Sequence, residues 1–167
     1  SAATNPYVVH IGLMFPLTTL QAVNDVEENP LALRVLSTPS YTINLASTIA
    51  AINLINGEST DILGFTSFFL GTQPHPECVI KIEYTVIDTV SDFGMALSQY
   101  EHQKLTLGKT FDLIIGPFRS SISVPISFVT GTQKIPMISP AATATELDDK
   151  RTHKYFTRTV PSDATVE

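Results

Sequence analysis

Two adjacent serines, Ser120 and Ser121, are the residues of this sequence whose types and spacing best suit chemistry. They follow the turn Gly116-Pro117 in "DLIIGPFRSSISVP", where an apolar strand ends and a helix can begin. The first N–H groups of a helix are unpaired and carry partial positive charge, so together with serine hydroxyls they can bind a carboxylate or phosphate. The same serines could instead cap their own helix, which is the commoner role of serine at such a position. Spacing alone favours the cap, and both alternatives remain open.

Pro125 bears on that choice. A proline inside a helix clashes with the carbonyl group four residues earlier. We therefore expect the helix either to start later, with Ser123 as its cap, or to have a distorted first turn. A later start would free Ser120 and Ser121 from capping, which favours a ligand role.

The stretch "SPAATATELDD" holds the second candidate group. Thr143 and Glu146 have the T-x-x-E spacing of a capping box, which predicts one or two helical turns over 143–149. The acidic residues that follow are typical of a solvated first turn opposing the helix dipole. This helix start would nevertheless face the same crevice as Ser120 if both follow neighbouring strands.

The elements that must position these residues alternate along the chain. Apolar or alternating runs predict strands at 7–15, 79–88, 111–116, 135–139 and 154–159. Helical spacing predicts helices at 41–57, 93–105 (with Asp92 as N-cap) and 121–133, while 16–39 and 58–77 read as loops, the latter containing Phe65, Phe68 and Phe69. Such alternation predicts an α/β fold, a three-layer sandwich of a parallel sheet with helices on both faces. Ligands then bind outside the carboxyl ends of the strands, where both serine groups would lie.

Composition narrows the function classes. The chain has 167 residues, the size of one domain, and a net charge of −6, which leaves no basic surface for nucleic acid. We find no apolar run long enough to span a membrane, so any membrane attachment would come from segments outside this chain. A single cysteine, Cys78, excludes an internal disulfide. Motifs of common enzymes are missing, and we expect no catalytic residues, metal or cofactor.

Three blocks in the second half of the chain resemble a known receptor family. "IIGPFRSSIS", "KIPMISPAATATEL" and "YFTRTVPSD" occur in the order and at the separations seen in the ligand-binding region of type I periplasmic-binding-protein-like receptors. This group includes class C G-protein-coupled receptors, natriuretic peptide receptors and bacterial branched-chain amino-acid binding proteins. "HIGLMFPL", "ASTIAAINLING" and "IEYTVIDTVSD" fit the family's first strand, first helix and second strand, so the resemblance covers nearly the whole chain.

The resemblance implies a two-lobed clamshell, of which residues 1–167 would be the N-terminal part of lobe 1. By position, Ser120, Ala141 and Thr143 fall on the sites that hold the carboxylate and amino group of an amino-acid ligand in the family, with Ala141 acting through its backbone. Ser121 is the fourth candidate, although we expect it mainly to serve the helix. The resemblance also implies a non-catalytic sensor on the extracellular or periplasmic side of a membrane and a dimer contact through lobe 1 helices.

The sequence departs from the family at three positions. Many animal receptors of this family have a cysteine where Val90 stands, some glutamate receptors have an aromatic residue at the position of Ser91, and Pro125 is unusual in the family's helix. These departures leave two alternatives open beside a cell-surface amino-acid sensor. One is a structural or protein-interaction module with an empty cleft; the other is a bacterial solute-binding protein. Because the chain stops after the predicted cap Ser162, we expect it to be a fragment that is marginally stable alone.

Overall fold

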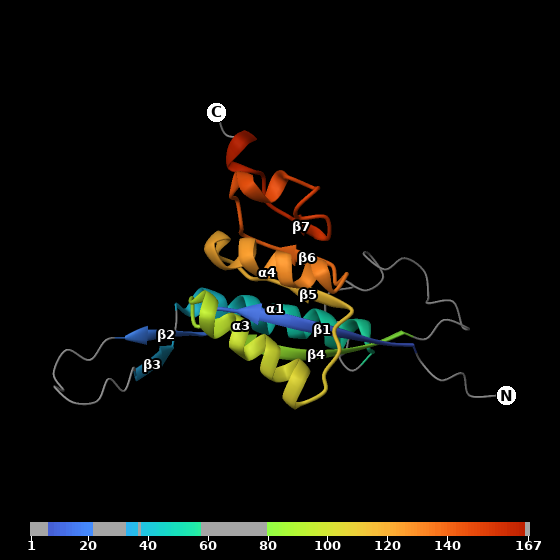
Figure 1. The fold of residues 1–167 in the computed structure, drawn as a ribbon. Helices are drawn as coiled ribbons and strands as arrows, with labels where there is room; N and C mark the ends of the chain where they lie inside the picture. The colour runs from blue at the N-terminus through green and yellow to red at the C-terminus, as the bar shows by residue number, and fades with distance from the viewer. Residues whose placement is uncertain (1–6, 22–32, 37, 58–79, 166–167) are drawn as a thin grey trace.

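A five-stranded parallel sheet forms the centre of the molecule (Figure 1). The computed structural model describes residues 7–21, 33–36, 38–57 and 80–165. The strands are β1 (Tyr7–Phe15), β4 (Ile80–Asp88), β5 (Leu113–Ile115), β6 (Met137–Ser139) and β7 (Phe156–Arg158), and their spatial order is β4-β1-β5-β6-β7. All five predicted strands are therefore confirmed, and the parallel arrangement brings their carboxyl ends to one edge.

Helices cover both faces of this sheet, which confirms the predicted three-layer α/β fold. Helix α1 (Pro39–Ile55) packs on one face. Helices α3 (Phe93–Glu101) and α4 (Ser120–Thr132) pack on the other, and α3 continues into a π-helical turn, η1 (His102–Thr106). The carboxylate of Asp92 accepts a hydrogen bond from the Met95 amide at 2.8 Å, so the predicted N-cap of α3 is also confirmed.

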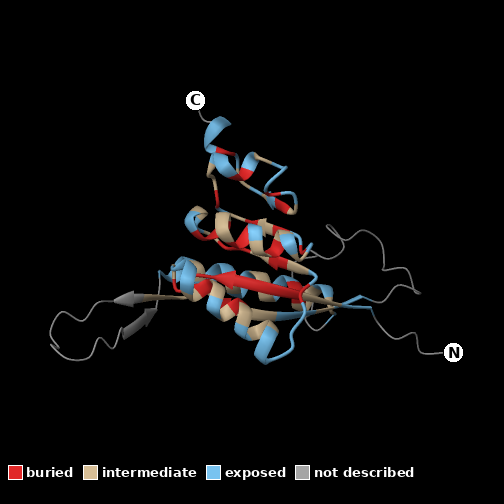
Figure 2. Ribbon diagram, viewed as in Figure 1, coloured by how far each residue is buried: buried red, intermediate tan, exposed pale blue. Residues whose placement is uncertain are grey.

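The core is divided into two clusters by the sheet. Strand β1 lies between β4 and β5, and its carboxyl half is buried on both sides (Figure 2). Alternate residues of a strand point to opposite faces, so Leu13 packs toward α1 while Met14 packs toward α3 and α4. The α3–α4 side holds the larger cluster, with Tyr100, Ile114, Ile126 and Met137 among its members.

A short antiparallel pair of strands lies within the stretch that the sequence analysis assigned to a loop. Strands β2 (Thr18–Gln21) and β3 (Leu33–Leu36) pair with each other and extend away from the sheet beyond the carboxyl end of β1 (Figure 1). The Asp88 carboxylate, at the end of β4, accepts hydrogen bonds from the amides of Leu17 and Thr18 at 3.0 and 3.2 Å. The loop prediction was wrong because this pairing joins segments separated along the chain and is held by a residue of another strand.

The C-terminal part of the described chain forms short 3₁₀ turns. These turns are η2 (Thr145–Asp148) and η3 (Asp163–Thr165). The predicted capping box is wrong, because η2 follows Ala144 and no side chain caps it. Ser162 does act at its turn, since its hydroxyl oxygen accepts the Ala164 amide at 3.3 Å.

Asn56 fastens the end of α1 to the outer edge of the sheet. Its side-chain amide donates to the Ile82 carbonyl and accepts from the Ile82 amide, both at 2.8 Å. An additional strand at this edge would bind the same backbone amide and carbonyl of Ile82. Asn56 therefore covers part of the open edge of β4.

We expect Asn56→Ala to lower the free energy of unfolding by about 1–3 kcal/mol, because two backbone groups of Ile82 lose their partners. Urea denaturation of the protein, followed by circular dichroism, measures this loss. Asn44→Ala, on an exposed part of the same helix, should change the midpoint little. Equal midpoints for the two variants would contradict the role assigned to Asn56.

Several predicted features lie outside the described residues, namely Cys78 and the loop 58–77 with Phe65, Phe68 and Phe69. Among the helices that the structure describes, none combines the length and apolar character needed to cross a membrane.

Candidate functional site

The turn between β5 and α4 is built around the carbonyl group of Pro117. The hydroxyls of Ser123 and Ser139 both donate to this oxygen, at 2.9 and 2.6 Å. Gly116 precedes the turn with φ of 99°, a region that favours glycine. A Cβ atom at Gly116 would lie 2.1 Å from the carbonyl oxygen of Met14 in β1. The chain can therefore enter α4 along this path only with glycine at that position.

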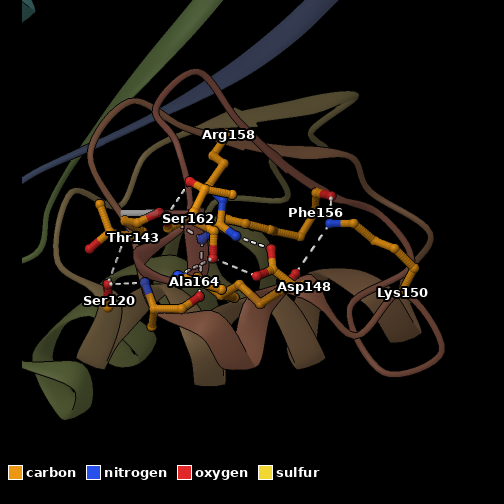
Figure 3. A network of polar contacts seen from close by, with 12 residues as sticks. Ser120, Thr143, Asp148, Lys150, Phe156, Arg158, Ser162 and Ala164 are labelled. Atoms are coloured by element: carbon orange, nitrogen blue, oxygen red, sulfur yellow. Dashed lines mark hydrogen bonds and ion pairs between the residues drawn. The ribbon is translucent and has the colours of Figure 1, made fainter. Parts of the chain in front are cut away.

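Ser120 does not cap its own helix. Helix α4 begins at Ser120, its N-cap residue is Arg119, and no side chain makes a capping hydrogen bond. The Ser120 hydroxyl oxygen instead accepts the amides of Thr143 and Ala144, at 3.1 and 3.2 Å (Figure 3). A hydroxyl that accepts two hydrogen bonds still has its own proton to donate. Ser120 thus joins the start of α4 to the loop after β6 and keeps one donor for another group.

Ser121 and Pro125 also differ from their predicted roles. Ser121 is the second residue of α4; it is exposed and makes no capping bond. Pro125 lies inside the helix, which nevertheless runs from Ser120 to Thr132 without a later start. The carbonyl group that loses its intrahelical donor belongs to the exposed Ser121, where water can replace the donor. Ser123, the predicted alternative cap, is buried and bonds to Pro117.

Thr143 and Ala141 lie on the loop that follows β6. Thr143 is half-buried, and its amide donates to Ser120 rather than belonging to a capping box. Its carbonyl oxygen accepts the Asp163 amide at 2.9 Å. Ala141 is exposed, and its amide lies 3.4 Å from the Ser139 hydroxyl oxygen. The structure therefore brings Ser120 and Thr143 into direct contact, with Ala141 two residues away on the same loop.

A charged network supports this loop from the other side (Figure 3). Arg158, at the end of β7, donates to the carbonyl oxygens of Ala142 and Ala144 at 3.3 and 3.0 Å. Its guanidinium group also pairs with Asp148, which accepts the Ser162 hydroxyl. The hydrogen bond from Ser162, followed by the nearby charge of Arg158, holds the pKa of the Asp148 carboxyl below its ordinary value.

Two residues of this site, Ser139 and Arg158, were not predicted from the sequence. Ser139 is fully buried and donates to Pro117 while accepting the Ala142 amide at 3.0 Å. Its position as the last residue of a strand at the ligand-binding edge was a usable signal. Arg158 had no comparable signal, because its partners lie 14 and 16 residues earlier in the chain.

The end of β4 contributes two further hydroxyls at the same edge of the sheet. The side-chain oxygens of Thr89 and Ser91 are buried and have no hydrogen-bond partner among the residues that the structure describes. Between them, Val90 is only 3% exposed, so an apolar side chain is buried where many animal receptors of the resembled family have cysteine. Val90 and Ser91 both have positive φ angles, of 51° and 56°. In the same turn, the amide of Val90 donates a hydrogen bond to the Asp88 carboxylate at 3.0 Å.

The arrangement suits the binding of an anionic group. The first intrahelical bond of α4 runs from the Ile122 amide to the Arg119 carbonyl at 3.0 Å, so the amides of Ser120 and Ser121 precede it. These amides lie at the positive end of the helix dipole, next to the hydroxyl of Ser120. Across the contact, the loop bearing Thr143 supplies a second hydroxyl. A carboxylate is a better match to this set of donors than a cation.

Comparison with known proteins decides the family. The model of the "receptor family ligand binding region" matches residues 78–166, which is more than half of the chain and contains the whole site. The chain belongs to this receptor family. The resemblance noted from the sequence blocks is thereby confirmed, and the observed parallel α/β sheet agrees with a part of a periplasmic-binding-protein-like lobe.

Three relatives show which receptors this chain is similar to. It is 38% identical over 61 residues to a probable metabotropic glutamate receptor, mgl-1, of Caenorhabditis elegans, covering 36% of this chain and 6% of the relative. It is 29% identical over 126 residues to a G-protein coupled receptor of family C, group 6 member A, of Carassius auratus, covering 74% of this chain and 14% of the relative. It is 41% identical over 51 residues to human metabotropic glutamate receptor 8, covering 30% of this chain and 6% of the relative.

The chain spans only a small part of these receptors, at most 14% of their length. What it shares with them is a receptor ligand-binding region, which lies on the extracellular side of a membrane. This location agrees with the expectation from the sequence.

Proposed function

We propose that this chain is the N-terminal part of lobe 1 of a two-lobed, non-catalytic sensor for a free amino acid or related carboxylate. Ser120 and the first amides of α4 would hold the ligand carboxylate, and Thr143 and the backbone of Ala141 would orient the ligand. Closure of the second lobe over the ligand would then shift a two-state receptor.

One observation carries this proposal: the contact between Ser120 and the Thr143 loop. These residues come from loops after two neighbouring strands, and the hydroxyl of Ser120 reaches the amides of Thr143 and Ala144. The Ser120 hydroxyl, at the start of α4, therefore brings the Thr143 loop to the amides that begin this helix. Two of the relatives, a probable and a human metabotropic glutamate receptor, support an amino acid as the ligand class.

A contact between Ser127 and His153 resembles part of a catalytic site but gives no reason to prefer an enzyme. The Ser127 hydroxyl lies 2.6 Å from Nδ1 of His153, a distance at which a histidine can activate a serine. Both side chains are buried, Ser127 on the inner side of α4 itself, and its hydroxyl also donates to the Val124 carbonyl at 2.7 Å. A substrate could not reach this hydroxyl without moving the helix.

We expect Ser120→Ala to weaken amino-acid binding about 10- to 100-fold, because a hydrogen bond to a charged ligand is lost and two loop amides lose their acceptor. Titration calorimetry with the twenty amino acids on the complete ligand-binding region measures this effect. Ser98→Ala, at an exposed position on α3, is the matched control and should bind normally.

Two results would overturn the proposal. If no amino acid binds the wild-type region, the amino-acid class is wrong and the alternative of a structural or interaction module gains support. If an amino acid binds and Ser120→Ala binds it equally well, the assignment of Ser120 is wrong.

We also propose a dimer contact through the lobe 1 helices α3 and α4. Phe128 on the outer side of α4 is 44% exposed, and Leu105 and Leu107 after α3 are exposed as well. Burial of these side chains against a partner would remove apolar surface from water. Sedimentation velocity of the complete region tests this proposal, and a monomer at micromolar concentration would contradict it.

A further inference from the structure

Arg158 binds the backbone on both sides of Thr143. Its Nη1 atom donates to the carbonyl oxygens of Ala142 and Ala144, at 3.3 and 3.0 Å. The amides of Thr143 and Ala144 meanwhile donate to Ser120. The peptide group between Ala142 and Thr143 is therefore held from two sides, by Ser120 of α4 through its amide and by Arg158 of β7 through its carbonyl group, and Ala144 is held in the same way through its own amide and carbonyl (Figure 3).

Arg158 is itself held in place. Its Nη2 atom pairs with the Asp148 carboxylate, and its side chain is only 10% exposed. Asp148 accepts the hydroxyl of Ser162, whose neighbour Asp163 donates its amide to the Thr143 carbonyl at 2.9 Å. The residues after β7 thus contact the loop at a third point. The ion pair with Asp148 fixes the orientation of the guanidinium group that binds the two carbonyl oxygens.

The chemistry of this contact requires arginine. A guanidinium group presents its donors in a rigid planar fork, so it can serve two carbonyl oxygens and a carboxylate at once. A lysine ammonium group is a single point with rotating donors and cannot span the same three acceptors. Both Nη atoms of Arg158 already bind acceptors within the protein, two carbonyl oxygens and a carboxylate, so the guanidinium group serves the loop.

We infer that Arg158 is a positioning residue of the ligand site, which fixes the orientation of Thr143 without touching the ligand. Its relevance to affinity rests on the proposed amino-acid function, whereas its effect on the loop does not. Loss of the guanidinium group would leave the carbonyl groups of Ala142 and Ala144 without their partner. The hydroxyl and backbone of Thr143 would then occupy a range of orientations.

Hydrogen–deuterium exchange on the complete ligand-binding region tests the loop directly, with no ligand added. In Arg158→Lys, we expect the amides of Thr143 and Ala144 to exchange about tenfold faster, while amides inside α4 keep their wild-type rates. A purely structural role would raise exchange across the whole domain. Arg151→Lys is the matched control, since Arg151 is 95% exposed and pairs only with Asp149.

Asp148→Asn provides a second variant if Arg158→Lys does not fold. It keeps Arg158 and removes the charge that orients it, so we expect a smaller increase in exchange, confined to the same two amides. Unchanged exchange of Thr143 and Ala144 in the folded variants would overturn the inference. Uniformly faster exchange in both variants would overturn it too.

Binding of the amino acid that the calorimetric panel identifies completes the test. We expect Arg158→Lys to bind it about tenfold more weakly than the wild type, and Arg151→Lys to bind it equally well. Wild-type affinity in Arg158→Lys, despite faster exchange of the loop, would overturn the positioning role. If no amino acid binds the wild type, the proposed function fails, while the exchange result still decides whether Arg158 holds the loop.

Discussion

Replacement of Gly116 by alanine is expected to prevent stable folding. The new Cβ would lie 2.1 Å from the carbonyl oxygen of Met14, which is a backbone atom of the neighbouring strand β1. The backbone at Gly116 also has φ of 99°, which an alanine adopts only with strain. Relief would require β1 and β5 to separate in the middle of the sheet. We expect a loss of at least about 4 kcal/mol, at the upper end of what single substitutions cause.

Gly108→Ala separates these two causes. Gly108 also has a positive φ, of 63°, but no atom lies within 4 Å of the position that its Cβ would take. This control should cost only about 1–2 kcal/mol, the price of the left-handed conformation for alanine. Thermal unfolding of the complete ligand-binding region, monitored by circular dichroism, compares the two variants. A loss of similar size for both would show that the contact with Met14 is not decisive.

Acidification is expected to destabilise the fold through His153. This side chain is 1% exposed, and its Nδ1 atom contacts the Ser127 hydroxyl at 2.6 Å. Its Nε2 atom is buried and has no partner within the described part of the chain. Burial lowers the pKa of His153 below its ordinary value. The nearby charges of Glu146 and Asp149 oppose that shift, and the charge of Lys150 adds to it.

The direction of the pH effect follows from this lowered pKa. In the unfolded chain the histidine has an ordinary pKa of about 6.5, so it takes up a proton at a pH where the folded state does not. Stability is therefore fully present above that pH, and it falls as the pH drops from about 6.5 toward the lower pKa of the folded state. The loss can reach at most about 1.4 kcal/mol per pH unit in that window.

His153→Phe should remove this part of the pH dependence. Phenylalanine keeps an aromatic ring against Phe128, whose ring centre lies 4.7 Å from that of His153, and it has no group to protonate. Ser127 keeps its hydrogen bond to the Val124 carbonyl, so no new unpaired hydroxyl is created. We expect stability at pH 7.5 to change by less than about 1.5 kcal/mol.

Urea denaturation at pH 7.5 and pH 5.5 measures the difference for the wild type and for each variant. Groups other than His153 contribute equally to the wild type and to His153→Phe, so they cancel in the comparison. His102→Asn is the control, because His102 is exposed. An unchanged pH dependence in His153→Phe would show that His153 is not the responsible group.

The order and type of most elements could be predicted because they depend on short-range patterns. The alternation of apolar residues in 79–88, the carboxylate of Asp92 before a helical run and the apolar strand ending at Gly116 each specify local structure within a few residues. The antiparallel pair β2–β3 escaped prediction because its partners are separated by a stretch of chain and one of its anchors, Asp88, belongs to another strand.

The candidate site shows the same difference between local patterns, which could be predicted, and long-range contacts, which could not. Local spacing assigned Ser120 or Ser121 to a helix cap and Thr143 to a capping box, and both assignments are wrong. A cap requires only neighbours in the sequence, whereas Ser120 and Thr143 are 23 residues apart and meet because β5 and β6 are adjacent in the sheet. Once the loops are adjacent, the amides of Thr143 and Ala144 donate to the hydroxyl of Ser120, and no local cap is needed.

The sequence by itself determined that this chain forms a parallel α/β sheet, where its strands end, and which loops meet at the ligand-binding edge. Only the tertiary structure decided what the polar residues of those loops do. It placed Ser120 against the Thr143 loop and Arg158 behind it. The physical reason is that apolar periodicity and backbone sterics act over a few residues. Hydrogen bonds between loops depend on the order and register of strands, which become defined only when the sheet forms.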